Sequence, residues 1–342
     1  MPRSLLRRRP ARRRPQPAAR CRTTDAGVSN QRIVTNVCFS FAMIEARELT
    51  KDYGDKRAVD GLSFDVRPGI VTGFLGPNGS GKSTTMRLIL GLDRPTKGRV
   101  TVNGKLYREH EAPLHEVGAL LEARSVHTGR SARNHLLALA QTHGISKRRV
   151  DELIDHVGLH EVARKRAGKF SLGMGQRLGI ATALLGDPHT VMLDEPVNGL
   201  DPEGIQWIRT LLKGLAAEGR TVFVSSHLMS EMAMTADHLI VIGRGRLIAD
   251  ASVADFVAGA SKPLVHVRSP QGEALREALK GPDVTFTVVE PGLFEVSGRT
   301  AAQVGEAAAA HGIVLHELSP HQASLEEAFM DLTRDELEFA AS

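Results

Sequence analysis

The sequence predicts an α/β domain with a largely parallel central sheet, followed by a small α+β unit. After residue 185, apolar strand-like runs alternate with helical runs, which is typical of parallel α/β sheets. Near residue 262 the pattern restarts with shorter segments. A chain of 342 residues is long enough for about two domains. We expect an α/β domain over residues 43–255 and an accessory domain over residues 262–342.

The basic charge of the chain is concentrated at its N-terminus. Residues 1–42 hold ten Arg, no Lys, one Asp and no Glu, a net charge of +9 that leaves −4 for the rest of a chain of net charge +5. Both cysteines, Cys21 and Cys38, also lie there, so the rest of the chain has no thiolate metal site and no disulfide. We expect residues 1–42 to be a disordered Arg-rich extension, or to precede the true translation start. An arm that binds nucleic acid or anionic lipid is the alternative, and no nucleic-acid binding is expected of the body.

No apolar run approaches the roughly 18 residues that a membrane-spanning helix needs. A membrane role would therefore require a second polypeptide.

Residues 44–104 contain short strands around one glycine-rich turn. "IEAREL" and "LSFDV" alternate apolar and polar residues, as half-buried strands do. "IVTGFL" (70–75) is a nearly continuous apolar run, typical of a strand buried on both faces, and "TTMRLILGL" (84–92) has helical spacing. The turn between them therefore joins a buried strand to a helix.

The turn matches the pattern G-x-x-x-x-G-K-[ST], which cradles phosphate groups. Its glycines let the backbone N–H groups point inward, and the following helix adds the positive end of its dipole. We expect Lys82 to reach the β- and γ-phosphates and the Ser83 hydroxyl to bind Mg²⁺. The residues predicted to hold the nucleotide here are Gly76, Pro77, Asn78, Gly79, Ser80, Gly81, Lys82, Ser83 and Thr84. Kinases, GTPases, helicases and transport ATPases share this pattern, so it predicts only a nucleoside triphosphate.

Acidic residues and a histidine follow two later strands. "VMLDEP" places Asp194 and Glu195 at the end of an apolar run, and "VSSH" ends another run with His227. We expect Asp194 to hold Mg²⁺, Glu195 to position or deprotonate an attacking water, and His227 to contact the γ-phosphate. Two solvated acids and a structural histidine are the alternative interpretation.

A second anion site is predicted where "KFSLGMGQRLGIATALL" enters a helix. Ser171 precedes the exposed N–H groups of Leu172, Gly173 and Met174. One nucleotide does not need two phosphate sites in one subunit, so we expect a head-to-tail dimer in which this site covers the γ-phosphate of the partner. A helix capped by Ser171 alone is the alternative.

The remaining segments complete two units. Residues 131–185 are expected to be mostly helical, and the α/β domain is expected to close near "HLIVIGRGRLIAD". From residue 262 the expected order is βαββαβ, as in ferredoxin-like units, with "IVLHELS" (313–319) as its last strand. A final helix is predicted from Ser324, with Glu327 completing a capping box.

These motifs together resemble the ATP-binding subunits of ABC transporters over about residues 43–250. "FSLGM" resembles the family's signature loop and "NGLD" (198–201) the loop that acts across the dimer. The resemblance implies a P-loop NTPase fold with a helical subdomain, ATP and Mg²⁺ as ligands, and His227 as the switch histidine. It also implies that Tyr53 stacks on adenine, that Ser171 and Gly173 approach the nucleotide, and that Asp201 acts across the dimer.

The chain departs from the family pattern at one position, and the resemblance also implies partner proteins. Glu122 stands where the family usually has a glutamine that senses Mg²⁺, and we expect it still to be able to bind the metal. "SLGMxQRLGIA" and the C-terminal extension resemble the drug- and antibiotic-export branch. That branch implies a homodimer or a related second ATPase, a separate multi-span permease, and a cytoplasmic location on the inner face of the membrane. A soluble ABC-type ATPase that regulates ribosomes or DNA is the alternative, and a different P-loop enzyme such as a kinase the more distant one.

Overall fold

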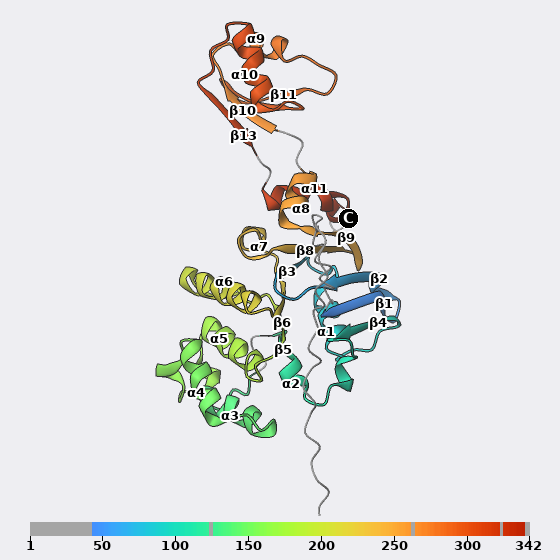
Figure 1. The fold of residues 1–342 in the computed structure, drawn as a ribbon, viewed down its shortest axis with the longest axis vertical. Coiled ribbons are helices and arrows are strands. Elements are labelled where there is room, and N and C mark those ends of the chain that lie inside the picture. Colours follow the sequence, from blue (N-terminus) through green and yellow to red (C-terminus); the bar gives the residue numbers. More distant parts are fainter. Residues whose placement is uncertain (1–42, 123–125, 261–263, 322–323, 339–342) are drawn as a thin grey trace, which may run out of the picture. The chain divides into compact units, whose positions relative to one another are not determined.

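The computed structural model describes residues 43–122, 126–260, 264–321 and 324–338 (Figure 1). The expectation for residues 1–42 lies outside the described residues. The described elements of the α/β domain are β1 (Ile44–Tyr53), β2 (Lys56–Val66), β3 (Val71–Leu75), α1 (Lys82–Ile89), β4 (Lys97–Val102), α2 (Pro113–Glu116), β5 (Val117–Leu120), α3 (Ala132–Thr142), α4 (Lys147–His156), α5 (Leu172–Ala183), β6 (Thr190–Asp194), α6 (Pro202–Ala217), β7 (Thr221–Ser225), α7 (Met229–Thr235), β8 (His238–Gly243), β9 (Arg246–Ser252) and α8 (Val253–Ala260).

A six-stranded sheet of order β5-β6-β7-β3-β8-β9 organises the α/β domain. Its first five strands are parallel, and β9 pairs antiparallel with β8. The predicted α/β class with a largely parallel sheet is therefore confirmed. Since β6, β7 and β3 are adjacent and parallel, their carboxyl ends meet at one edge. The glycine-rich turn, the acid pair and the histidine all follow these three strands.

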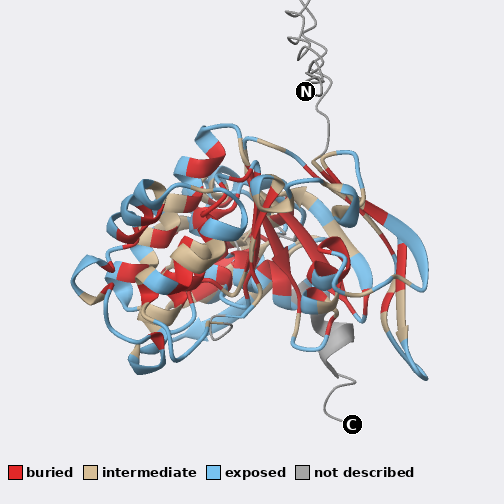
Figure 2. Cartoon of the chain, turned by 90° about the horizontal axis from the view of Figure 1, so that it is seen from below, coloured by how far each residue is buried: buried red, intermediate tan, exposed pale blue. Residues whose placement is uncertain are grey.

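Each face of this sheet packs on a different layer. Side chains of alternate strand positions, such as Val191 and Val222, join a core with helices α3 to α8. The intervening positions, such as Met192 and Phe223, join a second core with α1 and a separate antiparallel sheet of order β2-β1-β4. Figure 2 shows the central strands as buried, as expected for parallel strands covered on both faces.

Helices α3, α4 and α5 pack on one another and form the predicted helical subdomain. Ser131, Ser146 and Ser171 start these three helices, and each serine side chain accepts a hydrogen bond from an N–H group in the first turn. Among the described residues, no helix is long and apolar enough to cross a membrane.

The C-terminal unit has the predicted βαββαβ order. It contains β10 (Leu264–Arg268), α9 (Gly272–Ala278), β11 (Thr285–Glu290), β12 (Leu293–Ser297), α10 (Ala301–Ala310) and β13 (Glu317–His321), with sheet order β11-β12-β10-β13. The last strand was predicted too early, over residues 313–319. The backbone of Val314 bonds to side chains instead of a strand, because its N–H donates to Gln271 and its carbonyl accepts from Ser269.

The final helix, α11 (Leu325–Glu338), returns to the α/β domain. Its predicted capping box is confirmed, since the Ser324 N–H donates to Glu327 at 2.8 Å and the Glu327 N–H donates to the Ser324 hydroxyl at 3.1 Å. Its buried residues Leu325, Ala328 and Phe329 belong to the core that contains α7 and α8. This arrangement differs from the expectation that the helix belongs with the accessory domain, because the βαββαβ unit is inserted between α8 and α11.

Candidate functional site

The glycine-rich turn follows β3. At two of its positions the backbone and its surroundings leave room only for glycine. Gly81 has a φ of 108°, and a Cβ there would lie 2.5 Å from the Ala58 carbonyl oxygen. A Cβ on Gly76 would lie 2.4 Å from the Ile242 carbonyl oxygen. Helix α1 then starts without a side-chain cap, so its first N–H groups have no side-chain acceptor at the N-cap. Such an end attracts anions.

Lys82 is the first residue of α1, and its side chain folds back along the turn. Its Nζ donates to the carbonyl oxygens of Gly76 at 2.6 Å and Pro77 at 3.2 Å. Burial lowers the pKa of Lys82 below its usual range, while the nearby carboxylates of Glu195 and Asp194 raise it in part. A partly desolvated ammonium facing carbonyl groups is suited to exchange them for phosphate oxygens.

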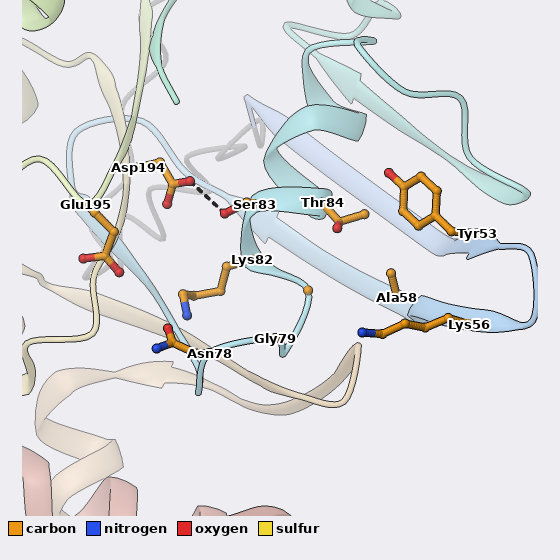
Figure 3. A pocket seen from close by; sticks show the side chains of 11 residues that line it. Tyr53, Lys56, Ala58, Asn78, Gly79, Lys82, Ser83, Thr84, Asp194 and Glu195 are labelled. Carbon is orange, nitrogen blue, oxygen red and sulfur yellow. Dashed lines mark hydrogen bonds between the residues drawn. The ribbon is translucent and has the colours of Figure 1, made fainter. Parts of the chain in front are cut away.

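Asp194 joins the turn to the end of β6. The Ser83 hydroxyl donates to Asp194 Oδ2 at 2.9 Å, a contact between residues 111 positions apart (Figure 3). The other carboxylate oxygen accepts a hydrogen bond from the Ser225 hydroxyl at the end of β7, whose register places Ser225 opposite Asp194. The hydroxyl and carboxylate oxygens that meet here are the hard ligands that Mg²⁺ prefers. The chemistry of these residues therefore fits the metal.

Glu195 and His227 meet beside this pair. Glu195 Oε2 lies 2.8 Å from His227 Nδ1 and also accepts from the His227 N–H at 3.4 Å. Glu195 has a φ of 50°, a left-handed conformation that is uncommon outside glycine and is often found at functional sites. Its backbone is held by Ser225 and by Gln176, whose buried amide donates to the Glu195 carbonyl oxygen at 3.2 Å.

Gln176 is a site residue that the sequence analysis missed. It lies on α5, two residues after the signature loop, and only 2% of it is exposed. A glutamine within a run of small and apolar residues is the available signal, since a buried amide needs a partner.

A cavity of about 380 Å³ lies over the turn. Its lining includes Tyr53, Lys56 and Ala58 at one end and Lys82, Asp194 and Glu195 at the other (Figure 3). The remaining lining residues are Asn78, Gly79, Gly81, Ser83 and Thr84. The structure thus brings most of the predicted nucleotide-binding residues around one cavity. Gly76, Pro77 and Ser80 do not line it, although the carbonyl oxygens of Gly76 and Pro77 accept hydrogen bonds from the Lys82 side chain.

Ser171, Gly173 and Asp201 do not line this cavity within the same chain. Ser171 and Asp201 cap α5 and α6, where their side chains accept N–H bonds at 3.2 and 2.9 Å. A Cβ on Gly173 would lie 2.9 Å from the Gly199 carbonyl oxygen, so the signature loop packs against "NGLD". These residues therefore form a second cluster that is separate from the cavity.

Glu122 is exposed and does not line the cavity either. It directly precedes residues 123–125, which the structure does not describe. Its predicted part in metal binding therefore stays a prediction.

Comparison with known proteins agrees with this geometry. The family model described as "ABC transporter" matches residues 59–198, and a domain of unknown function matches residues 263–326. The bacitracin transport ATP-binding protein BcrA of Bacillus licheniformis is 36% identical over 296 residues, which cover 85% of this chain and 97% of that protein. The lantibiotic transport ATP-binding protein SrtF of Streptococcus pyogenes is 34% identical over 206 residues, covering 60% of this chain and 89% of that protein.

Solved structures show the same fold. A dimeric ATP-binding cassette, captured after hydrolysis with ADP and Pi bound, has a TM-score of 0.57 and 25% identity to this chain. The match covers 61% of this chain and 98% of the cassette. The chain is an ATPase with ATP and Mg²⁺ as ligands, and it belongs to the ATP-binding proteins of ABC transporters.

Proposed function

We propose that this chain is the motor subunit of an exporter, in which ATP closes a head-to-tail dimer and hydrolysis reopens it. The observation that carries the proposal is the convergence of Lys82, Ser83, Asp194, Glu195 and His227 at the carboxyl ends of three adjacent strands. At this edge, the residues that can bind phosphate, the residues that can hold a metal and the pair that can position a water lie close together.

Each residue has a distinct part in the reaction. Lys82 and the first N–H groups of α1 hold the phosphates and offset their charge. Glu195 accepts a hydrogen bond from a water placed in line with the γ-phosphorus. As the water oxygen bonds to phosphorus, the bond to the bridging oxygen breaks and ADP leaves. His227 fixes the Glu195 carboxylate through its 2.8 Å contact.

The metal site is assigned to the same edge. Ser83 and Asp194 would hold Mg²⁺, Asp194 directly or through water, and Ser225 orients the Asp194 carboxylate. When bound, Mg²⁺ neutralises charge that develops on the phosphate oxygens. Glu122 is proposed as a further ligand, on the basis of its position in the sequence alone.

The second cluster supports a dimer. Ser171, Gly173 and Asp201 lie apart from the cavity of their own chain, so they are free to face a nucleotide held by a second copy or by a related ATPase. Tyr53 at the far end of the cavity is proposed to stack on adenine. Stacking on an aromatic ring is worth about 1–3 kcal/mol and tolerates other bases.

We assign the transported compound only to a class. The relatives act in bacitracin and lantibiotic transport, and we infer export of a drug, an antibiotic or a lipid-like compound through a separate membrane-spanning subunit. The ATPase would then be held at the inner face of the cell membrane by that subunit.

Purification of tagged chain from detergent-solubilised membranes of its native cell tests this proposal. A polytopic membrane protein recovered in near-equal amount supports a motor subunit, and its sequence would narrow the cargo. Recovery with ribosomes or DNA, and without a membrane protein, would instead support the regulatory alternative. A Lys82→Ala chain serves as a control for ATP-dependent changes in recovery.

A further inference from the structure

Tyr53, at the base-binding end of the cavity, is held by a hydrogen-bonded network. Its hydroxyl donates to Asp93 Oδ2 at 2.7 Å. The Arg87 guanidinium grips the same carboxylate, with Nε at 2.7 Å from Oδ2 and a terminal nitrogen at 3.4 Å from Oδ1. Lys51 Nζ lies 4.8 Å from the centre of the Tyr53 ring and donates to the Arg94 carbonyl oxygen at 2.8 Å.

The network joins the two ends of the nucleotide site. Tyr53 is the last residue of β1, and Arg87 lies on α1, the helix that begins at Lys82. Asp93 follows α1 in the chain, and its N–H is directed at the Arg87 carbonyl oxygen at 3.4 Å. The ring is therefore fixed relative to the helix whose first turn faces the phosphates.

The network also determines which part of the Tyr53 side chain is available to contact a base. Its hydroxyl is already used as a donor to Asp93, so the ring face is the part left for recognition. Tyr53 lines the cavity whereas Lys51 does not, although 45% of Tyr53 is exposed. An exposed aromatic side chain without such contacts would sample several rotamers, and binding would have to select one of them.

We propose that Asp93 is a positioning residue for nucleotide binding, which holds the Tyr53 ring in place for the base while α1 receives the triphosphate. The inference rests on the proposed role of this cavity in ATP binding. Asp93 acts through Tyr53 and does not touch the nucleotide. The pKa of Asp93 is held below its usual range, chiefly by the hydrogen bond from Arg87 and also by that from Tyr53, so the carboxylate stays ionised at neutral pH.

Calorimetric titration of the full chain with Mg²⁺ and either ATP or inorganic tripolyphosphate tests the proposal. Tripolyphosphate reports the phosphate grip without a base. Asp93→Ala and Tyr53→Phe should each weaken ATP binding by about 3- to 10-fold, the range expected for one hydrogen bond. Both should leave the tripolyphosphate Kd within about twofold of wild type. The double variant should be no weaker than the single variants, and KM for ATP should rise while kcat stays constant.

Asp151→Ala is the matched control, since the Arg133 guanidinium donates to Asp151 at 2.7 and 2.9 Å, and Asp151 has no hydrogen bond to a tyrosine among the described residues. An ATP Kd for both test variants equal to that of the control would overturn the proposal. An equal loss of ATP and tripolyphosphate would also overturn it, because it would give Asp93 a merely structural role. Tyr53→Phe keeps the ring, so it provides the test even if Asp93→Ala fails to fold.

Lys82→Ala separates this inference from the proposed function. If Lys82→Ala binds neither ATP nor tripolyphosphate, the result supports the role of Lys82 in phosphate binding, independently of the result for Asp93→Ala. Wild-type affinity for ATP in Lys82→Ala would instead refute the cavity as the ATP site.

Discussion

Phe329 provides a sharp test of how the C-terminal helix is attached. It lies on α11, only 6% of it is exposed, and it shares a core with Met229 and Met232 of α7 and Phe256 of α8. Met330, the next residue on the same helix, is 52% exposed. Phe329 therefore lies on the buried face of α11, and Met330 lies on its exposed face.

Phe329→Ala should destabilise the chain by about 3–5 kcal/mol, the usual cost of removing a buried phenylalanine. At roughly 2–4 °C for each kcal/mol, the melting temperature should fall by roughly 6 °C or more. Met330→Ala should change stability by no more than about 0.5 kcal/mol, because the side chain is exposed and alanine favours helices.

Thermal unfolding followed by circular dichroism, with wild type and both variants at equal concentration, measures these shifts. Melting temperatures for Phe329→Ala and Met330→Ala within about 2 °C of each other would refute the packing of α11 on the α/β domain. In that case α11 would belong with the accessory unit, as the sequence suggested.

Two further predictions concern a buried histidine and the dimer. Burial lowers the pKa of His135, with smaller contributions from Arg130 and His127, so the unfolded chain binds a proton there at a higher pH than the folded chain. The free energy of unfolding should therefore fall as pH drops below about 6.5, by at most about 1.4 kcal/mol per pH unit. In His135→Leu, the free energy of unfolding should depend less on pH, which urea titrations at several pH values would measure. An unchanged slope in His135→Leu would exclude this residue as the cause. Ser171→Arg should abolish ATP-dependent dimers in light scattering and leave the ATP affinity of the monomer within about twofold, because Ser171 does not line its own chain's cavity. Equal loss of monomer affinity would show that the loop supports its own cavity.

The sequence predicted the structure best where a motif requires both particular residue types and a particular backbone arrangement. The glycine-rich turn needs a strand before it and a helix after it, and the structure has β3 and α1 there. The acids after β6 and the histidine after β7 could be expected near the turn, because parallel strands bring their carboxyl ends to one edge. The 2.8 Å contact between Glu195 and His227 follows from the adjacency of β6 and β7.

Contacts between segments distant in sequence were not predictable in the same way. Leu325, Ala328 and Phe329 have the spacing of a buried helical stripe, but this spacing does not say which core receives it. Asp93 lies in a turn with no motif, and its bond to Tyr53 spans 40 residues. Such pairings depend on the tertiary fold, which local patterns do not encode.

The effect of Glu195→Gln on ATP turnover and on dimerisation tests the central claim most directly. The amide keeps the size of the side chain but is a poorer acceptor for the attacking water, so turnover should fall by about 10²- to 10⁴-fold. The variant should still bind ATP, and light scattering should show twice the monomer mass with Mg²⁺ and ATP and the monomer mass with ADP. Hydrolysis at the wild-type rate, or a monomer in the presence of ATP, would contradict the proposed motor.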